Sequence, residues 1–360
     1  MLINTSIINE NFEFVEEANL LIEKKLIKEV SCGFASGAKN FKNYLVMPSL
    51  INAHTHIGDS LFKGAADGLS VDSACGPEGL KWKLYKNAKR EDLIRAMRAS
   101  AKYMLNSGIS CFSDFREFGI PGINELKEAV SRIPIKSVIL GRELSIDEIS
   151  ECSGLGLNVY QLNENPDFLK ILQEIKNKNK ILAVHAGEVE GEVKAALKYN
   201  PGIIIHATKA TDEEIKEISG KNISVVCCPR SNAALGVGIP KIKKMLDLNI
   251  NACLGTDNVM LNSPDMWREM EFTAKFCGIK PEDVLKMATI NAASEFNLNS
   301  GIIEKNRNAD LIFIDRNSIN LKFNKDWISV IVNRCNPGNV RKVMISGRFV
   351  VDKDNKDNEI

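Results

Sequence analysis

The chain has 360 residues, of which 44% are apolar, and its 47 basic side chains nearly balance its 46 acidic ones. This composition is typical of a folded globular protein, and the absence of a basic stripe or zinc-finger spacing argues against a nucleic-acid partner. No apolar run approaches the ~20 residues that span a bilayer, and the N-terminus has no basic segment followed by an apolar core that would indicate a signal peptide.

The cysteine content predicts a reducing environment. There are nine cysteines, an odd number, with irregular spacing and no C-x-x-C motif. A disulfide scaffold is not expected in a chain of this length, so we expect free thiols and a cytoplasmic location.

The two ends of the chain are similar to each other and predict a small β domain. Residues 1–46 and 303–360 contain short apolar segments separated by turn-like clusters, and neither end is long enough to fold securely alone. We therefore expect both ends to form one composite β-sandwich domain. Its predicted strands include residues 19–22, 26–30, 310–315, 328–332, 342–345 and 349–351.

The middle of the chain, residues 47–302, alternates apolar runs with amphipathic helical stretches. After a first strand ending at residue 56, strands are predicted at 109–114, 136–140, 157–162, 181–185, 203–206, 223–227 and 250–256. The predicted helices include 90–107, 167–176, 266–277 and 281–296. Eight such alternations over about 250 residues predict a (β/α)8 TIM barrel. A doubly wound open sheet is the competing arrangement, although no G-x-G-x-x-G motif follows an early strand.

The histidines lie where a barrel carries its chemistry, at the C-terminal ends of strands. The chain has only four: His54 and His56 end the first strand, His185 the fifth and His206 the sixth. Asp257 follows the eighth strand. Imidazoles and a carboxylate at one barrel mouth suit a divalent metal, with Zn²⁺ expected and Fe²⁺ as the alternative.

Each of these residues also has an ordinary structural interpretation. An isolated H-x-H pair, or a lone His185 or His206, is more often a hydrogen-bonded structural histidine, and Asp257 alone would be a turn or helix-cap residue. The coincidence of all four histidines with predicted strand ends favours the metal site.

Several motifs resemble the amidohydrolase superfamily. The segment Met47-Pro-Ser-Leu-Ile-Asn-Ala-His-Thr-His56 resembles its strand-one signature, and His185-Ala-Gly-Glu188 resembles the strand-five motif of its purine and pyrimidine deaminases. Cys228-Pro-Arg-Ser-Asn232 and Leu254-Gly-Thr-Asp-Asn258 are similar to its strand-seven and strand-eight segments. The resemblance covers nearly the whole chain and is closest to the branch with cytosine, guanine and S-adenosylhomocysteine deaminases and chlorohydrolases.

The resemblance implies roles for the site residues. His54, His56, His185 and Asp257 would bind one metal ion, His206 would hydrogen-bond the catalytic water, and Glu188 would shuttle protons, with Asp257 also accepting a proton. Two-metal members carry a bridging lysine on strand four, where this chain has none, since Lys170 falls in the following helix. The expected site is therefore mononuclear.

Substrate contacts are predicted from position. Arg116 and Arg142 follow the second and third strands, and each could bind a substrate carboxylate or phosphate or hold loops together by a salt bridge. Trp82, in the first loop, could stack on a heteroaromatic ring, and Asn258 adjoins Asp257 in the strand-eight motif.

These observations give the sequence-based hypothesis. The protein is expected to be a metal-dependent aminohydrolase that removes ammonia from a small amino-substituted nitrogen heterocycle, such as a nucleobase, nucleoside or pterin-like ring. The alternatives are a chlorohydrolase or cyclic-amide hydrolase on the same scaffold, or a non-catalytic binding protein. The resemblance also makes a homo-oligomer an expectation. Because no apolar run is long enough to span a bilayer, a membrane partner is not expected.

Overall fold

The computed structural model describes residues 1–162 and 166–355, and the chain divides into two compact units. One unit comprises residues 1–51, 103–111 and the chain from residue 265 onward. The other comprises residues 52–102 and 112–264. The predicted domain boundaries at residues 46 and 302 stay a prediction. No helix within the described residues is long and apolar enough to cross a membrane.

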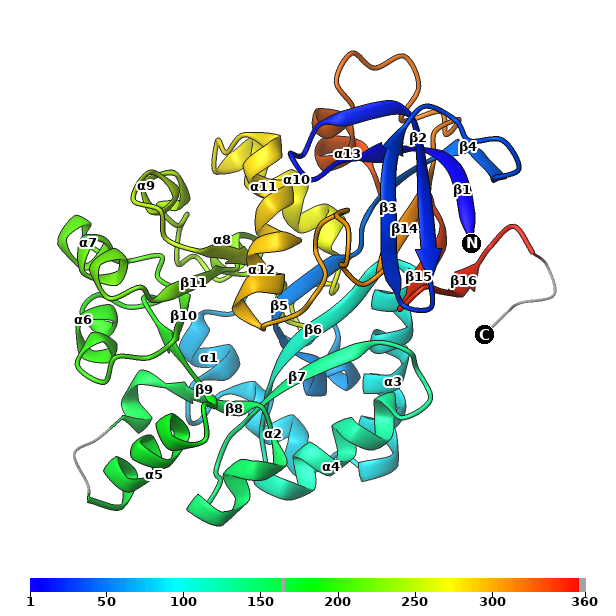
Figure 1. Cartoon of the computed structure of the whole chain (residues 1–360). Helices are drawn as coiled ribbons and strands as arrows, with labels where there is room; N and C mark the ends of the chain where they lie inside the picture. Colours follow the sequence, from blue (N-terminus) through cyan, green and yellow to red (C-terminus); the bar gives the residue numbers. More distant parts are fainter. Residues whose placement is uncertain (163–165, 356–360) are drawn as a thin grey trace. The chain divides into compact units, whose positions relative to one another are not determined.

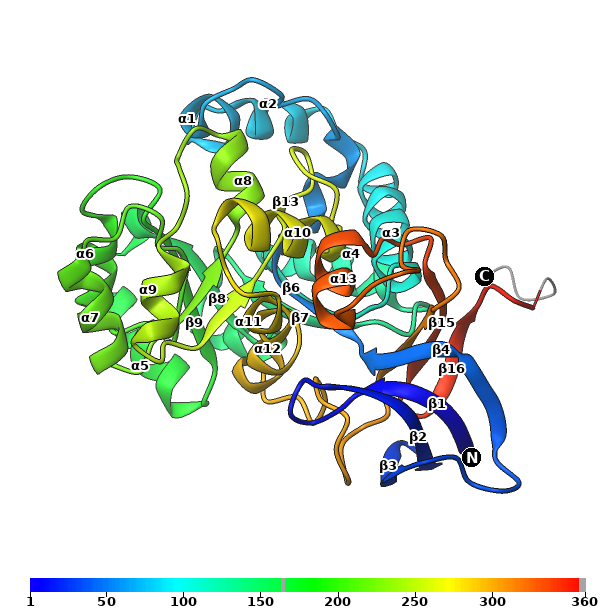
Figure 2. The ribbon, with the colours of Figure 1, turned by 90° about the horizontal axis from the view of Figure 1, so that it is seen from above.

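The first unit contains a seven-stranded sheet made by both ends of the chain, as predicted (Figure 2). Its strands, in sheet order, are β16 (Arg348–Asp352), β15 (Val340–Ile345), β14 (Leu311–Asp315), β4 (Lys39–Pro48), β1 (Leu2–Ile8), β2 (Phe14–Glu23) and β3 (Leu26–Cys32). Residues from both ends, including Ile3, Leu20, Val46, Leu311 and Phe313, are fully buried in one apolar cluster. Burial of this shared core explains why neither end needs to fold alone.

The predicted strand at residues 328–332 is wrong, because this segment lies in helix α13 (Trp327–Arg334). The β-branched residues there favour a strand when propensity alone is considered. However, the Asp326 carboxylate caps the helix by accepting the backbone N–H groups of Ile328 and Ser329 at 2.9 and 3.2 Å. Helix α13 also packs on α10 (Met266–Phe276) and α11 (Pro281–Met287), which bury one of its faces.

The second sheet is the predicted parallel barrel. Its strands are β5 (Leu50–His56), β6 (Ile109–Arg116), β7 (Lys136–Gly141), β8 (Gly154–Asn158), β9 (Ile181–Ala186), β10 (Ile203–His206), β11 (Ser224–Cys227), β12 (Ala252–Leu254) and β13 (Asp257–Asn258). Strands β12 and β13 are two parts of one interrupted strand. Because β12 pairs with β11 and β13 pairs with β5, this eighth strand closes the ring.

Helices connect successive barrel strands, and Figure 1 shows α4 and α5 on the outside of the curved sheet. The connecting helices are α3 (Arg90–Asn106), α4 (Gly119–Val130), α5 (Pro166–Asn177), α6 (Glu192–Leu197), α7 (Asp212–Gly220), α8 (Pro229–Ala234) and α9 (Ile242–Asp247), while α12 (Ile290–Glu295) follows α11. The long connection after β5 carries two further short helices, α1 (Val71–Cys75) and α2 (Leu80–Lys86).

The predicted fourth strand is displaced, since β8 spans residues 154–158 rather than 157–162. Two of its first three residues, Gly154 and Gly156, are glycines, which the sequence pattern does not favour in a strand. The packing explains Gly156, because a Cβ atom there would lie 2.6 Å from the Phe115 ring. The strand then ends at Asn158, whose side chain forms a capping box with Gln161 at the start of a 3-10 turn.

Candidate active site

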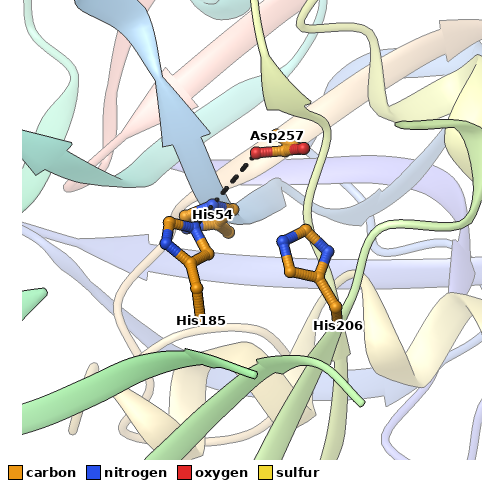
Figure 3. A group of neighbouring side chains, drawn as sticks. All are labelled: His54, His185, His206 and Asp257. Carbon is orange, nitrogen blue, oxygen red and sulfur yellow. Dashed lines mark hydrogen bonds and ion pairs between the residues drawn. The ribbon is translucent and has the colours of Figure 1, made fainter. Parts of the chain in front are cut away.

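Four side chains from the ends of four strands converge on one point (Figure 3). His54, His185, His206 and Asp257 each offer a ligand atom, and these atoms all lie within 4.8 Å of one another. His54 Nε2 lies 3.0 Å from His185 Nε2 and 3.2 Å from Asp257 Oδ1. His56 belongs to the same group, because its Nε2 lies 3.3 Å from His185 Nε2 and 3.6 Å from Asp257 Oδ1.

The hydrogen bonds behind the rings direct lone pairs toward this point. His185 Nδ1 lies 2.8 Å from Asn158 Oδ1, and His56 Nδ1 lies 3.1 Å from Glu117 Oε1. Glu117 Oε1 is an acceptor, so His56 Nδ1 carries the proton and its Nε2 presents a lone pair. His185 Nδ1 also lies 3.0 Å from Arg142 Nη2, and with this nitrogen assigned as donor to the closer Asn158 Oδ1, His185 Nε2 presents a lone pair as well. Two lone pairs 3.3 Å apart repel each other unless a cation lies between them. Metal–nitrogen bonds of 2.0–2.1 Å give about this separation between two ligands, so the residues fit a divalent metal.

The electrostatic environment leaves the candidate ligands in the protonation states that bind a cation. Burial lowers the pKa of His54, His185 and His56, the last to about 3, so all three rings are neutral at pH 7. Burial opposes ionisation of Asp257, but the hydrogen bond with His54 and the neighbouring imidazoles outweigh it and hold the pKa of this carboxyl below its ordinary value. The result is a set of neutral imidazoles with one carboxylate, a donor set that suits zinc.

The loop that holds Asp257 is shaped around the ligands. Asp257 has a left-handed backbone (φ +59°), a conformation that is costly for residues other than glycine and is found at functional sites. Ser231 Oγ donates to Asp257 Oδ2 at 2.5 Å and fixes the carboxylate. A Cβ atom at Gly255 would lie 2.7 Å from His54 Cβ, so only glycine allows the eighth strand to pass beside this ring.

Glu188 lies beside the convergence point, with Oε2 3.8 Å from His206 Nε2. Its side chain is 19% exposed, and burial raises the pKa of the carboxyl. The backbone that carries Glu188 is held by Glu192, whose Oε2 accepts the N–H groups of Gly187, Glu188 and Val189 at 2.9, 3.0 and 3.1 Å. A half-buried carboxyl on a fixed turn is suited to proton transfer.

The Nδ1 atom of His206 faces an amide side chain, that of Asn232, on the side of the ring away from the site. With the Asn232 amide assigned so that Nδ2 faces the ring, it donates to His206 Nδ1 at 3.2 Å. A neutral imidazole that accepts at Nδ1 carries its proton at Nε2. His206 then presents an N–H group to the site, which suits a hydrogen bond to a water molecule.

A second group of buried charges lies behind His56. Lys81 Nζ lies 2.5 Å from Glu117 Oε1 and 3.0 Å from Asp59 Oδ2, and Arg116 Nη2 lies 3.2 Å from Glu117 Oε2. All four side chains are at most 3% exposed. Burial opposes ionisation of Glu117, but Lys81 and the His56 hydrogen bond outweigh it and hold the pKa of Glu117 well below its ordinary value.

A cavity of about 290 Å³ opens onto the convergence point, near the lower end for small-molecule sites. Three of the four predicted substrate contacts, Trp82, Arg142 and Asn258, line it together with His56, His185, Glu188, His206 and Asp257. The fourth, Arg116, lies in the buried group behind His56.

Most of the chain matches a known family. The model of the amidohydrolase family matches residues 45–350, and a protein from Methanothermobacter thermautotrophicus, whose name marks it as a candidate aminohydrolase, is 34% identical over 93% of this chain and 94% of its own. The chain belongs to the amidohydrolase family. The resemblance seen in the sequence motifs is therefore confirmed.

Other members of the amidohydrolase family extend this comparison. A protein from Clostridium tetani named 5-methylthioadenosine/S-adenosylhomocysteine deaminase is 29% identical over 96% of this chain and 91% of its own. The crystal structure of an adenosine deaminase from Xanthomonas campestris with bound zinc superimposes with a TM-score of 0.81, at 19% identity, covering 99% of this chain and 94% of that one. The structural likeness confirms the barrel fold.

Several residues of this amidohydrolase site were not found by sequence reasoning. Lys81, Glu117, Asp59 and Glu192 have no motif of their own, and their partners are separated along the chain or lie in the backbone. Glu117 had one available signal, since it directly follows strand β6, where barrel enzymes place functional side chains. Asn232 and Ser231 lie inside the strand-seven motif, but only the coordinates give their partners.

Proposed function

We propose that this amidohydrolase-family protein is a metal-dependent deaminase that releases ammonia from an amino-substituted nitrogen heterocycle of the nucleoside type. The observation that carries the proposal is the placement of Glu188 beside imidazoles that share one convergence point, at the mouth of a cavity large enough for a small ring. The names of the relatives, deaminases of adenine nucleosides among them, support the nucleoside class.

We assign His54, His56, His185 and Asp257 as the metal ligands, with His206 reserved for the water. The assignment of His206 rests on its Nε2–H group, and that of His56 on its Nε2 lone pair. The alternative ligand set exchanges His56 for His206, and these four residues are those drawn in Figure 3. Zn²⁺ is the proposed metal, because neutral imidazoles with a carboxylate are common zinc ligands. The adenosine deaminase structure from Xanthomonas campestris, which has the same fold, contains bound zinc.

The protein residues carry out the proton transfers. A bound divalent cation would lower the pKa of water to about 7 and so supply hydroxide at neutral pH. Asp257 accepts the proton of the attacking water, and His206 orients that water through Nε2–H. Glu188 protonates the ring nitrogen next to the amino-bearing carbon, which makes that carbon electrophilic. The water oxygen bonds to that carbon, and transfer of the proton held by Asp257 to the amino group then allows the C–N bond to break and ammonia to leave.

Arg142 is the proposed contact for a polar group of the substrate. Its Nη2 donates to Asn158 Oδ1 at 3.1 Å, and its buried Nε has no hydrogen-bond partner among the described residues. A buried donor without a partner is costly, so a substrate oxygen in the cavity would satisfy it. Trp82 and Asn258, which also line the cavity, are proposed to contact the ring.

The test is ammonia release from a panel of aminated purine nucleosides, pyrimidines and pterins by the zinc-loaded protein. Ammonia formation from at least one member supports the deaminase proposal. Opening of a ring amide or release of chloride, without ammonia from any aminated ring, favours the rival hydrolase reactions. A protein that cannot be loaded with metal favours the non-catalytic alternative.

A further inference from the structure

The buried charges behind His56 link the first loop of the barrel to the metal site. Lys81 lies on helix α2 and Asp59 in the turn after β5, whereas Glu117 directly follows β6. One oxygen of Glu117, Oε1, contacts both Lys81 Nζ, at 2.5 Å, and His56 Nδ1, at 3.1 Å. The ring of His56 is therefore held from behind by a carboxylate that a lysine of another element fixes in place.

The buried side chains form one connected network of ion pairs and hydrogen bonds. Asp59 Oδ2 forms an ion pair with Lys81 Nζ at 3.0 Å, and Asp59 Oδ1 accepts a hydrogen bond from the Tyr85 hydroxyl at 2.7 Å. The lysine therefore pairs with two carboxylates, those of Asp59 and Glu117. Arg116 contacts the other oxygen of Glu117 at 3.2 Å. Burying four charges is expensive, and such groups persist only when their partners are in place. Because Glu117 contacts His56, a proposed metal ligand, the network points to a role at the metal site in addition to stabilising the barrel.

We propose that Glu117 and Lys81 are positioning residues that hold His56 in the tautomer and orientation needed to bind the metal. Glu117 accepts the Nδ1–H group of His56, which leaves the Nε2 lone pair facing His185 and Asp257. Lys81 acts through Glu117 by fixing its carboxylate. The inference rests on the proposed role of His56 as a ligand.

The network has a consequence for the loop that lines the cavity. Lys81 and its neighbour Trp82 both line the cavity, as do Val71 and Cys75 of helix α1. The same lysine therefore anchors the loop and supports the ligand. Metal affinity and the placement of this loop are coupled through Lys81 and Glu117.

The test is the affinity of metal-stripped protein for Zn²⁺, measured by competition with a chromogenic chelator and without any substrate. Loss of a partner behind a ligating histidine typically weakens metal binding by about 10–100-fold, and we expect this for Glu117→Ala and Lys81→Met. Glu117→Gln keeps an acceptor oxygen and should lose less than Glu117→Ala. Lys83→Met, an exposed lysine on the same helix, is the matched control and should bind Zn²⁺ as the parent does.

A double variant shows whether Lys81 acts through Glu117. If it does, Glu117→Ala with Lys81→Met should bind Zn²⁺ within about twofold of Glu117→Ala alone. The Co²⁺-loaded variants add a readout of ligand geometry, and the visible absorption spectrum should change in Glu117→Ala and Lys81→Met but not in Lys83→Met. If Glu117→Ala fails to fold, Glu117→Gln and Lys81→Met carry the same comparison.

Unchanged Zn²⁺ affinity and an unchanged Co²⁺ spectrum in the Glu117 variants would overturn the inference. If the losses of Zn²⁺ affinity caused by the two single substitutions multiply in the double variant, Lys81 does not act through Glu117, and that part of the inference is overturned. These measurements use no substrate, so failure of the deaminase assay would leave them intact. Normal deamination by Glu117 variants that bind Zn²⁺ more weakly would show that the two proposals are independent.

Discussion

His54 Nε2 lies 3.0 Å from His185 Nε2, although 131 residues separate the two along the chain. The pair comes from strands β5 and β9, and both rings are neutral because burial lowers their pKa values. Such a close approach of ring nitrogens is expected where both bind one cation. The predictions below follow from this contact and from the residues around it.

Replacing His185 by alanine should remove the metal. The variant loses one imidazole of the proposed ligand set, and removal of a ligand leaves too few donors for a stable site. Metal analysis after purification in excess Zn²⁺ should find about one ion in the parent and far less in the variant. Full occupancy in the variant would show that His185 is not a ligand.

A comparison of His56→Asn with His206→Asn decides between the two ligand sets. We expect His56→Asn to lose Zn²⁺ and His206→Asn to keep it while turnover falls about 10²-fold or more, as for a lost hydrogen bond to the reacting water. The measurements are zinc content and ammonia release for each purified variant. The opposite pattern, with zinc lost from His206→Asn alone, would favour the ligand set of Figure 3.

Glu192 should control turnover without binding the metal. Its Oε2 accepts three successive N–H groups of the turn that carries Glu188, so Glu192→Ala leaves that turn free to move. A displacement of about 1 Å can cost about 10²-fold in rate, and we expect kcat to fall by this order with zinc content unchanged. Glu192→Gln keeps an acceptor oxygen and should recover part of the loss.

The control for this prediction is Glu190→Ala, because Glu190 is an exposed glutamate of the same loop. It should retain the parental kcat. Equal kcat values for Glu192→Ala and Glu190→Ala would mean that the carboxylate of Glu192 does not position Glu188.

The metal-free protein should lose stability in mild acid. Burial lowers the pKa of His54, His56 and His185 below the ordinary value of 6.5, so below that pH the unfolded chain binds protons that the folded chain does not. The contribution of these three groups to the free energy of unfolding is therefore fully present above pH 6.5 and is lost as the pH falls below it. The free energy of unfolding should therefore be smaller at pH 5.5 than at pH 7.5, and His56, whose pKa is lowered to about 3, contributes about 1 kcal/mol of this difference.

Denaturant titrations in the presence of a chelator measure this difference. His56→Asn removes one titrating group and should reduce the pH dependence. A stability that does not change between the two pH values would contradict the assignment of neutral buried rings.

Much of this structure could be predicted from the sequence, and the failures have physical causes. The barrel strands are apolar runs ended by polar residues, and the histidines at their ends share one mouth because parallel strands place their C-terminal ends together. Residues 328–332 look like a strand because of their β-branched side chains, yet the Asp326 cap and the packing on α10 and α11 make them helical. The predicted fourth strand was displaced because β8 begins with a glycine-rich segment, in which Gly156 is required by the Phe115 ring and Gly154 by the backbone of Ile181.

The second layer of the site could not be predicted in the same way. Lys81 and Glu117 are 36 residues apart, and neither position carries a pattern that requires the other. Arg116 was predicted either to bind substrate or to hold loops by a salt bridge, and only the structure shows that it pairs with the buried Glu117 carboxylate. Pairwise contacts of this kind depend on the three-dimensional path of the loops, which local sequence patterns do not encode.

The most direct test of the account is the rate of ammonia release by Glu188→Gln at the same zinc content as the parent. Glutamine has nearly the same size but cannot shuttle a proton, so the account predicts full zinc occupancy with kcat lowered by about 10²–10⁴-fold. Near-parental turnover of the zinc-loaded variant would contradict it.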